Sequence, residues 1–460
     1  MTELADMFTT ATQNKSIKAL LSSRPLTAFI DCFTDRPQLE LQHLTHNDIT
    51  AYVSDRLLRH PQIASRLVIT DEELDSFVGE IEDSASGVFL WDRLVVSSLL
   101  DGIQDGDRID DLQRSLRALP HDLEDLFTHM LKRVPAKYRA QAACIFQILR
   151  CNNQGVEFSI HHGGHEPLSA CRLHYAEISV DEILAADIAD FSDAHLRKIE
   201  EHIGRRLRSH CAGLLELWPR TKSSKHGDRE EPLREQQDVS YLHRCVADFL
   251  SKTDVWEEIT SHVTVPPSQV SQAVLQSFVM TAKTERDQDT YSMKRLRKLV
   301  SNGILFAQLT EAKTGSGSTK ILNELDKAMS IRFQGSRTYL WYTMSGKRKL
   351  ANWNDTYKDY KSRPAAWQSH PNFMSLTVRH GLTLYVEKTI RARGKNCLKK
   401  QGRTLLDYAC RPVPHEGRWS EFIQPGLVGP LLPVKKGADP NKQFDGLSAW
   451  QHSLYLRGHP

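Results

Sequence analysis

The sequence predicts a mainly α-helical protein built from several domains. Apolar residues recur three and four positions apart through most of residues 39–150, which is the spacing of one buried helix face. One pair of short apolar runs, residues 211–217 and 239–242, instead fits a β-hairpin. The chain has 460 residues. At roughly 150 residues per domain, it should hold about three compact units.

The composition is that of an ordinary globular protein with a weak overall charge. Sixty basic and 57 acidic side chains leave a net charge of +3, too small to attract polyanions over the whole surface. The eight cysteines include no C-x-x-C pair, and no secretory segment opens the chain, which favours reduced thiols and a cytoplasmic location. The apolar stretch 87–100 is interrupted by Asp92 and Arg93 and is too short to span a membrane, so it predicts a buried helix and no membrane partner.

Short amphipathic helices are predicted along residues 39–150. Thr45 is the expected N-cap of a helix from about His46 to Leu58. Thr70 and Glu73 have the spacing of a capping box, in which each side chain bonds the other's backbone N–H at the start of a helix. Further helices are predicted over residues 88–99, 110–119, 123–134 and 138–149.

The middle of the chain predicts one small β-containing unit among helices. The polar, glycine-containing residues 151–167 are expected to form a loop. The 211–217 and 239–242 hairpin, with a helix after it, would form a winged-helix-like unit whose polar insert, 219–237, is a surface loop. Helices are also predicted over residues 168–188, 267–309 and 320–329, with a joint at Gly315–Ser318.

Several short motifs occur in a fixed order along residues 15–260. They are Ser22-Ser23-Arg24-Pro25, Leu44–Ile49, Tyr52-Val53, Gly87–Trp91, Leu94–Val96, Leu119–Leu126, Cys211–Glu216, Tyr241–Arg244 and Asp248–Leu250. In order and spacing they resemble the fungal NACHT-type STAND NTPases, which are NLR-like signalling proteins. The resemblance implies that residues 1–38 are the C-terminal remnant of a P-loop NTPase α/β core, 39–150 a helical domain and 151–265 a winged-helix-like domain.

The chain departs from that family where nucleotide chemistry resides. No G-x-x-x-x-G-K-S/T phosphate-binding loop occurs in the 460 residues, and only 21 precede Ser22, too few for the strand, loop and helix that carry one. A lone strand at residues 17–22 would expose both edges, so residues 1–35 should pack weakly. ATP/ADP or GTP/GDP is expected only in an intact relative, and no cofactor, metal or catalytic residue is predicted here.

The end of the chain has a second resemblance. Residues 266–370 read as a helical linker region, and 371–460 are similar to degenerate ankyrin repeats. The similarity rests on Gly402–Cys410, Gly437–Asn441 and Gly446–Trp450, with residues 373–385 as the preceding helix pair. The two repeat starts lie 44 positions apart, longer than the ankyrin period near ~33, which implies an insertion.

Two residues are candidate nucleotide sensors by family resemblance. Arg24 stands where an intact relative places an arginine that senses the nucleotide's phosphate. His243 stands where the winged-helix histidine of the family reaches the phosphates in the closed state. For both, the alternative is a purely structural role, as an ion pair for Arg24 and as a histidine satisfied within its own domain for His243.

Two further clusters contain residue types that occur in binding sites. His161, His162 and His165, with Cys151 and Cys171 nearby in sequence, do not have the spacing of a standard zinc site. Residues 337–363 interleave aromatic and basic side chains, which suits stacking on nucleic-acid bases but also suits helix anchors on a core.

These observations lead to three functional hypotheses. The first is a non-catalytic NLR/STAND-like signalling or scaffold protein that acts by protein–protein interaction, with an intact NACHT relative as one candidate partner. The second is an incomplete piece of an active ATP- or GTP-dependent NACHT switch. The third is a nucleic-acid-binding module that uses residues 337–363.

Overall fold

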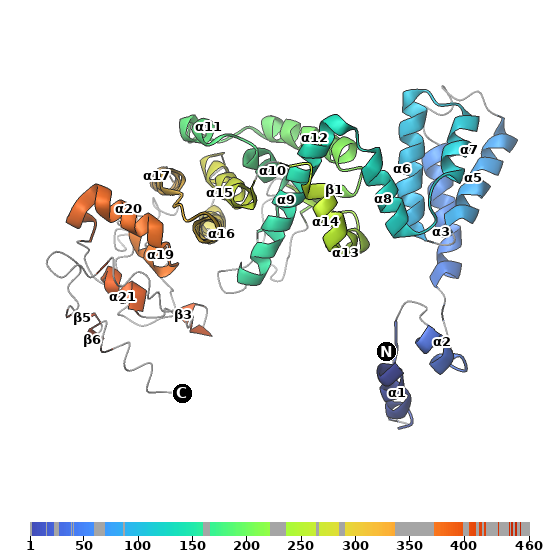
Figure 1. Cartoon of the computed structure of the whole chain (residues 1–460), viewed down its shortest axis with the longest axis horizontal. Coiled ribbons are helices and arrows are strands. Elements are labelled where there is room, and N and C mark those ends of the chain that lie inside the picture. Colours follow the sequence, from blue (N-terminus) through green and yellow to red (C-terminus); the bar gives the residue numbers. More distant parts are fainter. Residues whose placement is uncertain are drawn as a thin grey trace. The chain divides into compact units, whose positions relative to one another are not determined.

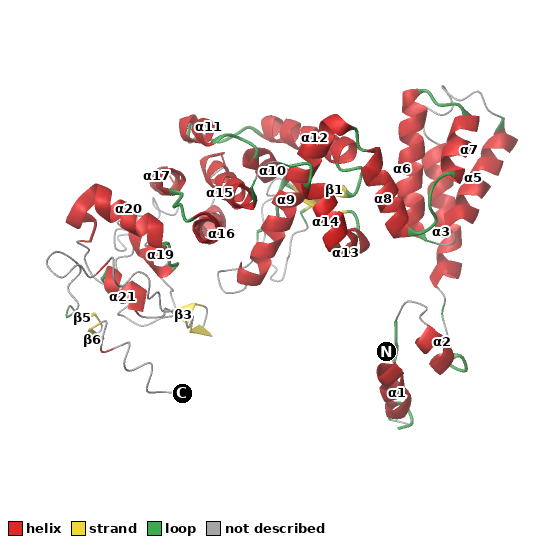
Figure 2. Cartoon of the chain, in the orientation of Figure 1, coloured by secondary structure: helices red, strands yellow, loops and turns green. Residues whose placement is uncertain are grey.

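A computed structural model of the chain is mainly helical (Figures 1 and 2), with helices making up 74% of the residues that it describes. The mainly α prediction is therefore confirmed. The described residues are 2–14, 16–22, 27–37, 39, 41–58, 70–85, 88–159, 166–220, 236–263, 266–284, 290–335, 372–398, 404–410, 414–415, 418–419, 431, 441, 443–444, 447–448 and 451. Arg24, His161, His162, His165 and the whole of 337–363 lie outside them.

The chain divides into two compact units, Met1–His129 and Met130–Pro460. The first contains α1 (Thr2–Ala11), α2 (Thr27–Phe33), α3 (Leu41–Leu58), α5 (Asp71–Ala85), α6 (Phe89–Asp105) and α7 (Ile109–Arg117), and α8 (Leu123–Arg133) contains the division. Helices α3, α5, α6 and α7 pack on one another around buried Val53, Phe77, Ile81 and Trp91. The Trp91 indole N–H donates to the Pro120 carbonyl at 2.8 Å, so even the polar edge of this core residue is satisfied.

The helix ends in the first unit follow local chemistry. The capping box at α5 is confirmed, because the Thr70 N–H donates to Glu73 at 2.9 Å and the Glu73 N–H donates to Thr70 Oγ1 at 3.3 Å. Helix α6 ends at Gly106, whose φ of 97° is a left-handed conformation that glycine adopts without strain. The predicted start of α3 is wrong: the helix begins at Leu41, so Thr45 lies inside it and is not its N-cap. Apolar spacing upstream of Thr45 continues the helix and overrides the capping signal.

The predicted remnant of an α/β core is not confirmed. In the described part of residues 1–38 there are two short helices and no strand. Residues 17–22 are irregular, and the Leu20 side chain is 100% exposed. That exposure agrees with the prediction that this segment packs weakly.

The second unit contains all remaining elements. They are α9 (Ala136–Ser159), α10 (Ala170–Ala176), α11 (Val180–Ala185), α12 (Asp193–His210), β1 (Leu215–Pro219), β2 (Gln237–Tyr241), α13 (Arg244–Leu250), α14 (Thr253–Thr260), α15 (Pro267–Thr284), α16 (Thr290–Thr314), α17 (Thr319–Gly335), α19 (Phe373–Arg379), α20 (Thr383–Arg393), the 3-10 helix η3 (Gly394–Leu398), α21 (Leu405–Cys410), and the two-residue strands β3 (Pro414–His415), β4 (Arg418–Trp419), β5 (Gln443–Phe444) and β6 (Leu447–Ser448). Helix α15 is central, because it packs against α9, α10, α16 and α17.

The predicted hairpin is confirmed, with its strands shifted by a few residues. β1 and β2 pair antiparallel, with Leu215 opposite Tyr241 and Pro219 opposite Gln237, and α13 follows directly. An additional bridge joins Asp238 of β2 to Ser169, and the Val239 N–H donates to the Leu168 carbonyl at 2.8 Å. The segment before α10 therefore lies along the outer edge of β2.

The loop predicted from residue 151 is wrong for its first half. Helix α9 continues to Ser159, through the predicted domain end at residue 150, and buries Cys151 and Asn152. The polar composition of residues 151–167 led to the loop prediction. The Asn152 side chain instead lies inside the fold, where it bonds to Arg172.

The C-terminal region contains the predicted helix pair. Helices α19 and α20 pack together across a turn in which Gly381 has a φ of 71°. Thr404 caps α21, because its Oγ1 accepts from the Asp407 N–H at 3.1 Å. These helices fit the mainly helical prediction, while an ankyrin-like array is not confirmed.

Candidate functional site

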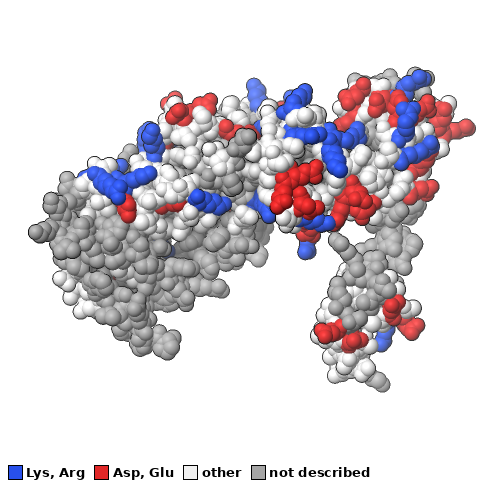
Figure 3. All heavy atoms as spheres, viewed as in Figure 1, with Lys and Arg blue, Asp and Glu red and all other residues white. Residues whose placement is uncertain are grey.

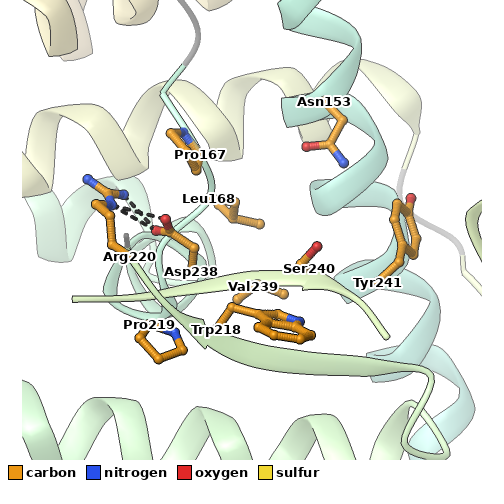
Figure 4. Close-up of a pocket in the computed structure, with 10 residues that line it drawn as sticks. All are labelled: Asn153, Pro167, Leu168, Trp218, Pro219, Arg220, Asp238, Val239, Ser240 and Tyr241. Carbon is orange, nitrogen blue, oxygen red and sulfur yellow. Dashed lines mark hydrogen bonds and ion pairs between the residues drawn. The ribbon is translucent and has the colours of Figure 1, made fainter. Parts of the chain in front are cut away.

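A pocket of about 530 Å³ lies on the β-hairpin of the second unit (Figure 4). Asn153 reaches it from α9, and Pro167 and Leu168 from the segment before α10. The hairpin supplies the rest of the lining: Trp218, Pro219, Arg220, Asp238, Val239, Ser240 and Tyr241. In Figure 4, Arg220 and Asp238 lie at one end and Asn153 and Tyr241 at the other.

An ion-pair cluster closes the charged end. Arg220 donates to Asp238 from Nε at 3.0 Å and from Nη2 at 2.6 Å, and from Nη1 to Glu166 at 2.8 Å. Glu166 is 4% exposed and also pairs with Lys298 at 3.3 Å. Burial disfavours the guanidinium charge, but the bonds to Asp238 and the charges of both carboxylates outweigh it and raise the pKa of Arg220. Two cations face two anions, so the cluster is electrically balanced.

A buried arginine fixes the wall formed by residues 166–168. Arg172 is 2% exposed and donates from Nη1 to the carbonyls of Glu166 at 3.2 Å and Pro167 at 3.1 Å. Its Nη2 donates to Asn152 at 3.0 Å, and its guanidinium lies 3.7 Å from the ring centre of Phe278. This wall is therefore held by α9 and α15 as well as by β2.

The end with Asn153 and Tyr241 has no ionisable carboxyl group among its lining residues. The Arg150 guanidinium lies close enough to act on Tyr241 electrostatically, and among the described residues its Nη1 is buried without a hydrogen-bond partner. Trp218 is 47% exposed and lies on β1 directly opposite Asp238, beside the ion-pair cluster. Burial raises the pKa of Tyr241, so its hydroxyl remains protonated at neutral pH and can donate a hydrogen bond. In the part of the chain that the structure describes, the side chains of Asn153, Ser240 and Tyr241 have no hydrogen-bond partner.

Of the two predicted nucleotide sensors, one can be placed. His243 is exposed at the N-cap of α13, where its Nδ1 accepts from the Cys245 N–H at 3.2 Å. That bond is the local structural role considered for this histidine. Arg24 is outside the described residues, so both nucleotide roles stay predictions.

The described residues show neither a metal-ligand cluster nor a membrane-spanning helix. Among them, no three His, Cys, Asp or Glu side chains gather as metal ligands would. None of the helices in these segments combines the length and apolar character needed to cross a membrane.

Comparison with known proteins gives one match. A family model described as a domain of unknown function, DUF7791, matches residues 133–291, a stretch that includes every residue lining the pocket. No curated protein and no solved structure matches the chain. The matched description names no activity.

The sequence interpretation missed the pocket and its supports. Glu166 lies within the predicted loop 151–167, Asp238 directly follows the predicted insert 219–237, and Arg172 lies within a predicted helix. Only the fold brings their side chains together. Trp218 is the residue that could have pointed to the pocket from sequence, because it is a large aromatic residue directly before a polar insert. In the structure it is exposed, which is unusual for so large an apolar side chain.

Proposed function

We propose that this chain is a non-catalytic, NLR/STAND-like scaffold that acts by protein–protein interaction. The observation that carries the proposal is the serial packing of the second unit. Helix α10 packs on α15, α15 on α16 and α17, α17 on α20, and α20 on α19. Proteins built by stacking successive helices present long continuous surfaces, and such surfaces commonly bind other proteins.

Buried polar side chains join these helices. Lys283 of α15 is 0% exposed and donates to the Ile183 carbonyl at 2.6 Å and the Ala186 carbonyl at 2.7 Å. It also pairs with Glu324 of α17 at 2.8 Å. A buried cation with all these partners ties α11, α15 and α17 into one arrangement, since removing a partner leaves an uncompensated charge.

A second joint connects α16 to α20. Glu311 accepts from the backbone N–H groups of Leu384 at 3.2 Å and Tyr385 at 2.9 Å. These are among the first N–H groups of α20, which no residue of the same helix can satisfy. The Tyr385 hydroxyl donates to Asn323 at 2.9 Å, so α17 contributes to the same contact.

The surface charge also favours protein partners over polyanions. Lys and Arg side chains are interspersed with Asp and Glu over the described surface in the view of Figure 3. Together with a net charge of +3, this gives little long-range attraction for nucleic acid.

The test measures partner binding and nucleotide binding on the same purified chain. A phosphate-binding-loop-containing NACHT protein from the same genome serves as partner in sedimentation velocity, and ATP and ADP with Mg²⁺ are titrated by calorimetry. We expect a complex at micromolar concentrations and no nucleotide binding. Lys283→Met should weaken the complex, whereas Lys327→Met, an exposed contact of the same Glu324, should not. Micromolar affinity for ATP or ADP would refute the non-catalytic proposal and support the incomplete-switch alternative.

A further inference from the structure

The residues that line the pocket on the hairpin carry no net charge, since Arg220 and Asp238 are its charged members. The Arg220 guanidinium is bound by the carboxylates of Asp238 and Glu166, and Glu166 also binds Lys298. A phosphate or carboxylate group entering this end would have to break bonds that are already made in a partly buried site. The ligand that fits is therefore uncharged.

The pocket also offers several unused groups that can donate hydrogen bonds. The Asn153 amide, the Ser240 hydroxyl and the Tyr241 hydroxyl each carry a donor, and none is used by the described residues. A ligand rich in free carbonyl oxygens would satisfy them. Proline-rich peptides in the polyproline II conformation are such ligands, because they have no internal hydrogen bonds and their proline residues lack N–H groups.

The apolar lining matches the same ligand. Trp218 presents about half of its side-chain surface, and Pro167, Leu168 and Pro219 line the space beside it. Pyrrolidine rings pack well on flat aromatic faces, and polyproline segments are recognised by aromatic grooves with a few polar donors.

We propose that this pocket binds an uncharged, proline-rich peptide segment of a partner protein in the polyproline II conformation, with a proline ring packed on Trp218. The proposal rests on the protein-interaction function proposed above and names the chemistry recognised at one site. The pocket is prepared for such a ligand, because Arg172 and the β2 edge hold the 166–168 wall in place before binding. Little ordering of the protein is then needed on binding, which favours affinity for a short peptide.

The test titrates a blocked hexaproline peptide into the full chain by calorimetry, beside a blocked Gly-Ser peptide of equal length and inorganic phosphate. We expect sub-millimolar binding of hexaproline only. Trp218→Ala should weaken binding by about 10-fold or more, as loss of an aromatic anchor does. Tyr241→Phe, which removes one donor, should weaken it by about 3- to 10-fold. Ile331→Ala, an equally exposed apolar residue on α17, is the matched control and should have no effect.

Trp218 is half-exposed, so its variant should fold, and circular dichroism checks this. The proposal would be overturned if hexaproline did not bind at about 1 mM, or if the Gly-Ser peptide bound equally well. It would also be overturned if Trp218→Ala left the affinity for hexaproline unchanged, or if phosphate bound and Trp218→Ala abolished that binding. If hexaproline fails while the NACHT complex still forms, the peptide site is wrong and the scaffold function stands. If hexaproline binds and no complex with the NACHT protein forms, the scaffold function is wrong and the peptide site stands.

Discussion

Asp92 is a buried carboxyl group that the fold leaves without compensation. It is 0% exposed on α6, and among the described residues neither of its carboxyl oxygens has a hydrogen-bond partner in another residue. Its own backbone N–H favours the charged form only weakly. Glu82 of α5 repels it electrostatically, and one Glu82 oxygen is likewise buried without a partner in the described part of the chain. Burial first, and this repulsion second, raise the pKa of Asp92 to about 7. The folded first unit therefore favours a protonated, neutral Asp92.

The size and sign of the effect follow from the two pKa values. An unfolded Asp loses its proton near the reference value of 3.8, whereas the folded one loses it near 7. The folded state thus binds one proton more between these values, and its stability falls as pH rises through that window. Between pH 5 and pH 7.5 the loss is about 2.5 kcal/mol, at ~1.36 kcal/mol per pH unit across the window and levelling off near pH 7.

Asp92→Asn removes this titration while preserving side-chain shape. The test is hydrogen exchange of the α6 amides, corrected for intrinsic rates, in the full chain at pH 5 and pH 7.5. The free energy of opening of the variant minus that of the wild type should grow by about 2.5 kcal/mol from the lower to the higher pH. Any constant cost of burying the amide cancels in this comparison. Asp83→Asn, an exposed carboxylate on α5, serves as the control and should show no such growth. A difference that stays constant with pH would refute the reasoning.

Three further predictions concern packing and reactivity. Lys283→Met should destabilise the second unit by about 3–5 kcal/mol in urea denaturation, against under about 1 kcal/mol for Lys327→Met, because only Lys283 is a fully buried cation. Gly106→Ala should lower stability by about 1 kcal/mol, measured as a reduced urea midpoint, since its φ of 97° strains any side chain. Burial raises the pKa of the Cys211 thiol, which disfavours the reactive thiolate. Iodoacetamide at pH 8 should therefore modify exposed Cys32 at least 10-fold faster than buried Cys211, as followed by mass spectrometry. Equal rates would contradict the burial of Cys211.

The elements best predicted from sequence are those defined by neighbouring residues. The Thr70 and Glu73 capping box involves contacts within three positions, which a sequence displays directly. The hairpin was also found, because its two apolar runs flank a long polar insert. The start of α3 differs from the prediction, because apolar spacing upstream of Thr45 continues the helix past a local capping signal. The length of α9 differs, because Cys151 and Asn152 are buried in the fold despite the polar sequence around them.

The pocket could not be predicted, because its residues meet only through long-range pairing. Asn153 and Tyr241 are separated by 88 positions, and the wall between them depends on a bridge from Ser169 to Asp238. No periodicity connects such residues. The sites predicted from sequence are instead two phosphate sensors, Arg24 and His243. Of these, His243 lies in the described part of the chain, where its Nδ1 caps a helix.

Arg172 and Arg220 show why basic residues are a poor guide to ligands in this chain. Arg172 uses its charge on backbone carbonyls, an asparagine and an aromatic ring, and Arg220 uses its charge on two carboxylates. Both guanidinium groups therefore build the pocket and neither is left to attract an anion. The proposed peptide would then be recognised through an indole face and the three neutral donors that the described residues leave unused. A neutral peptide is therefore the ligand to test first at this pocket, with inorganic phosphate beside it.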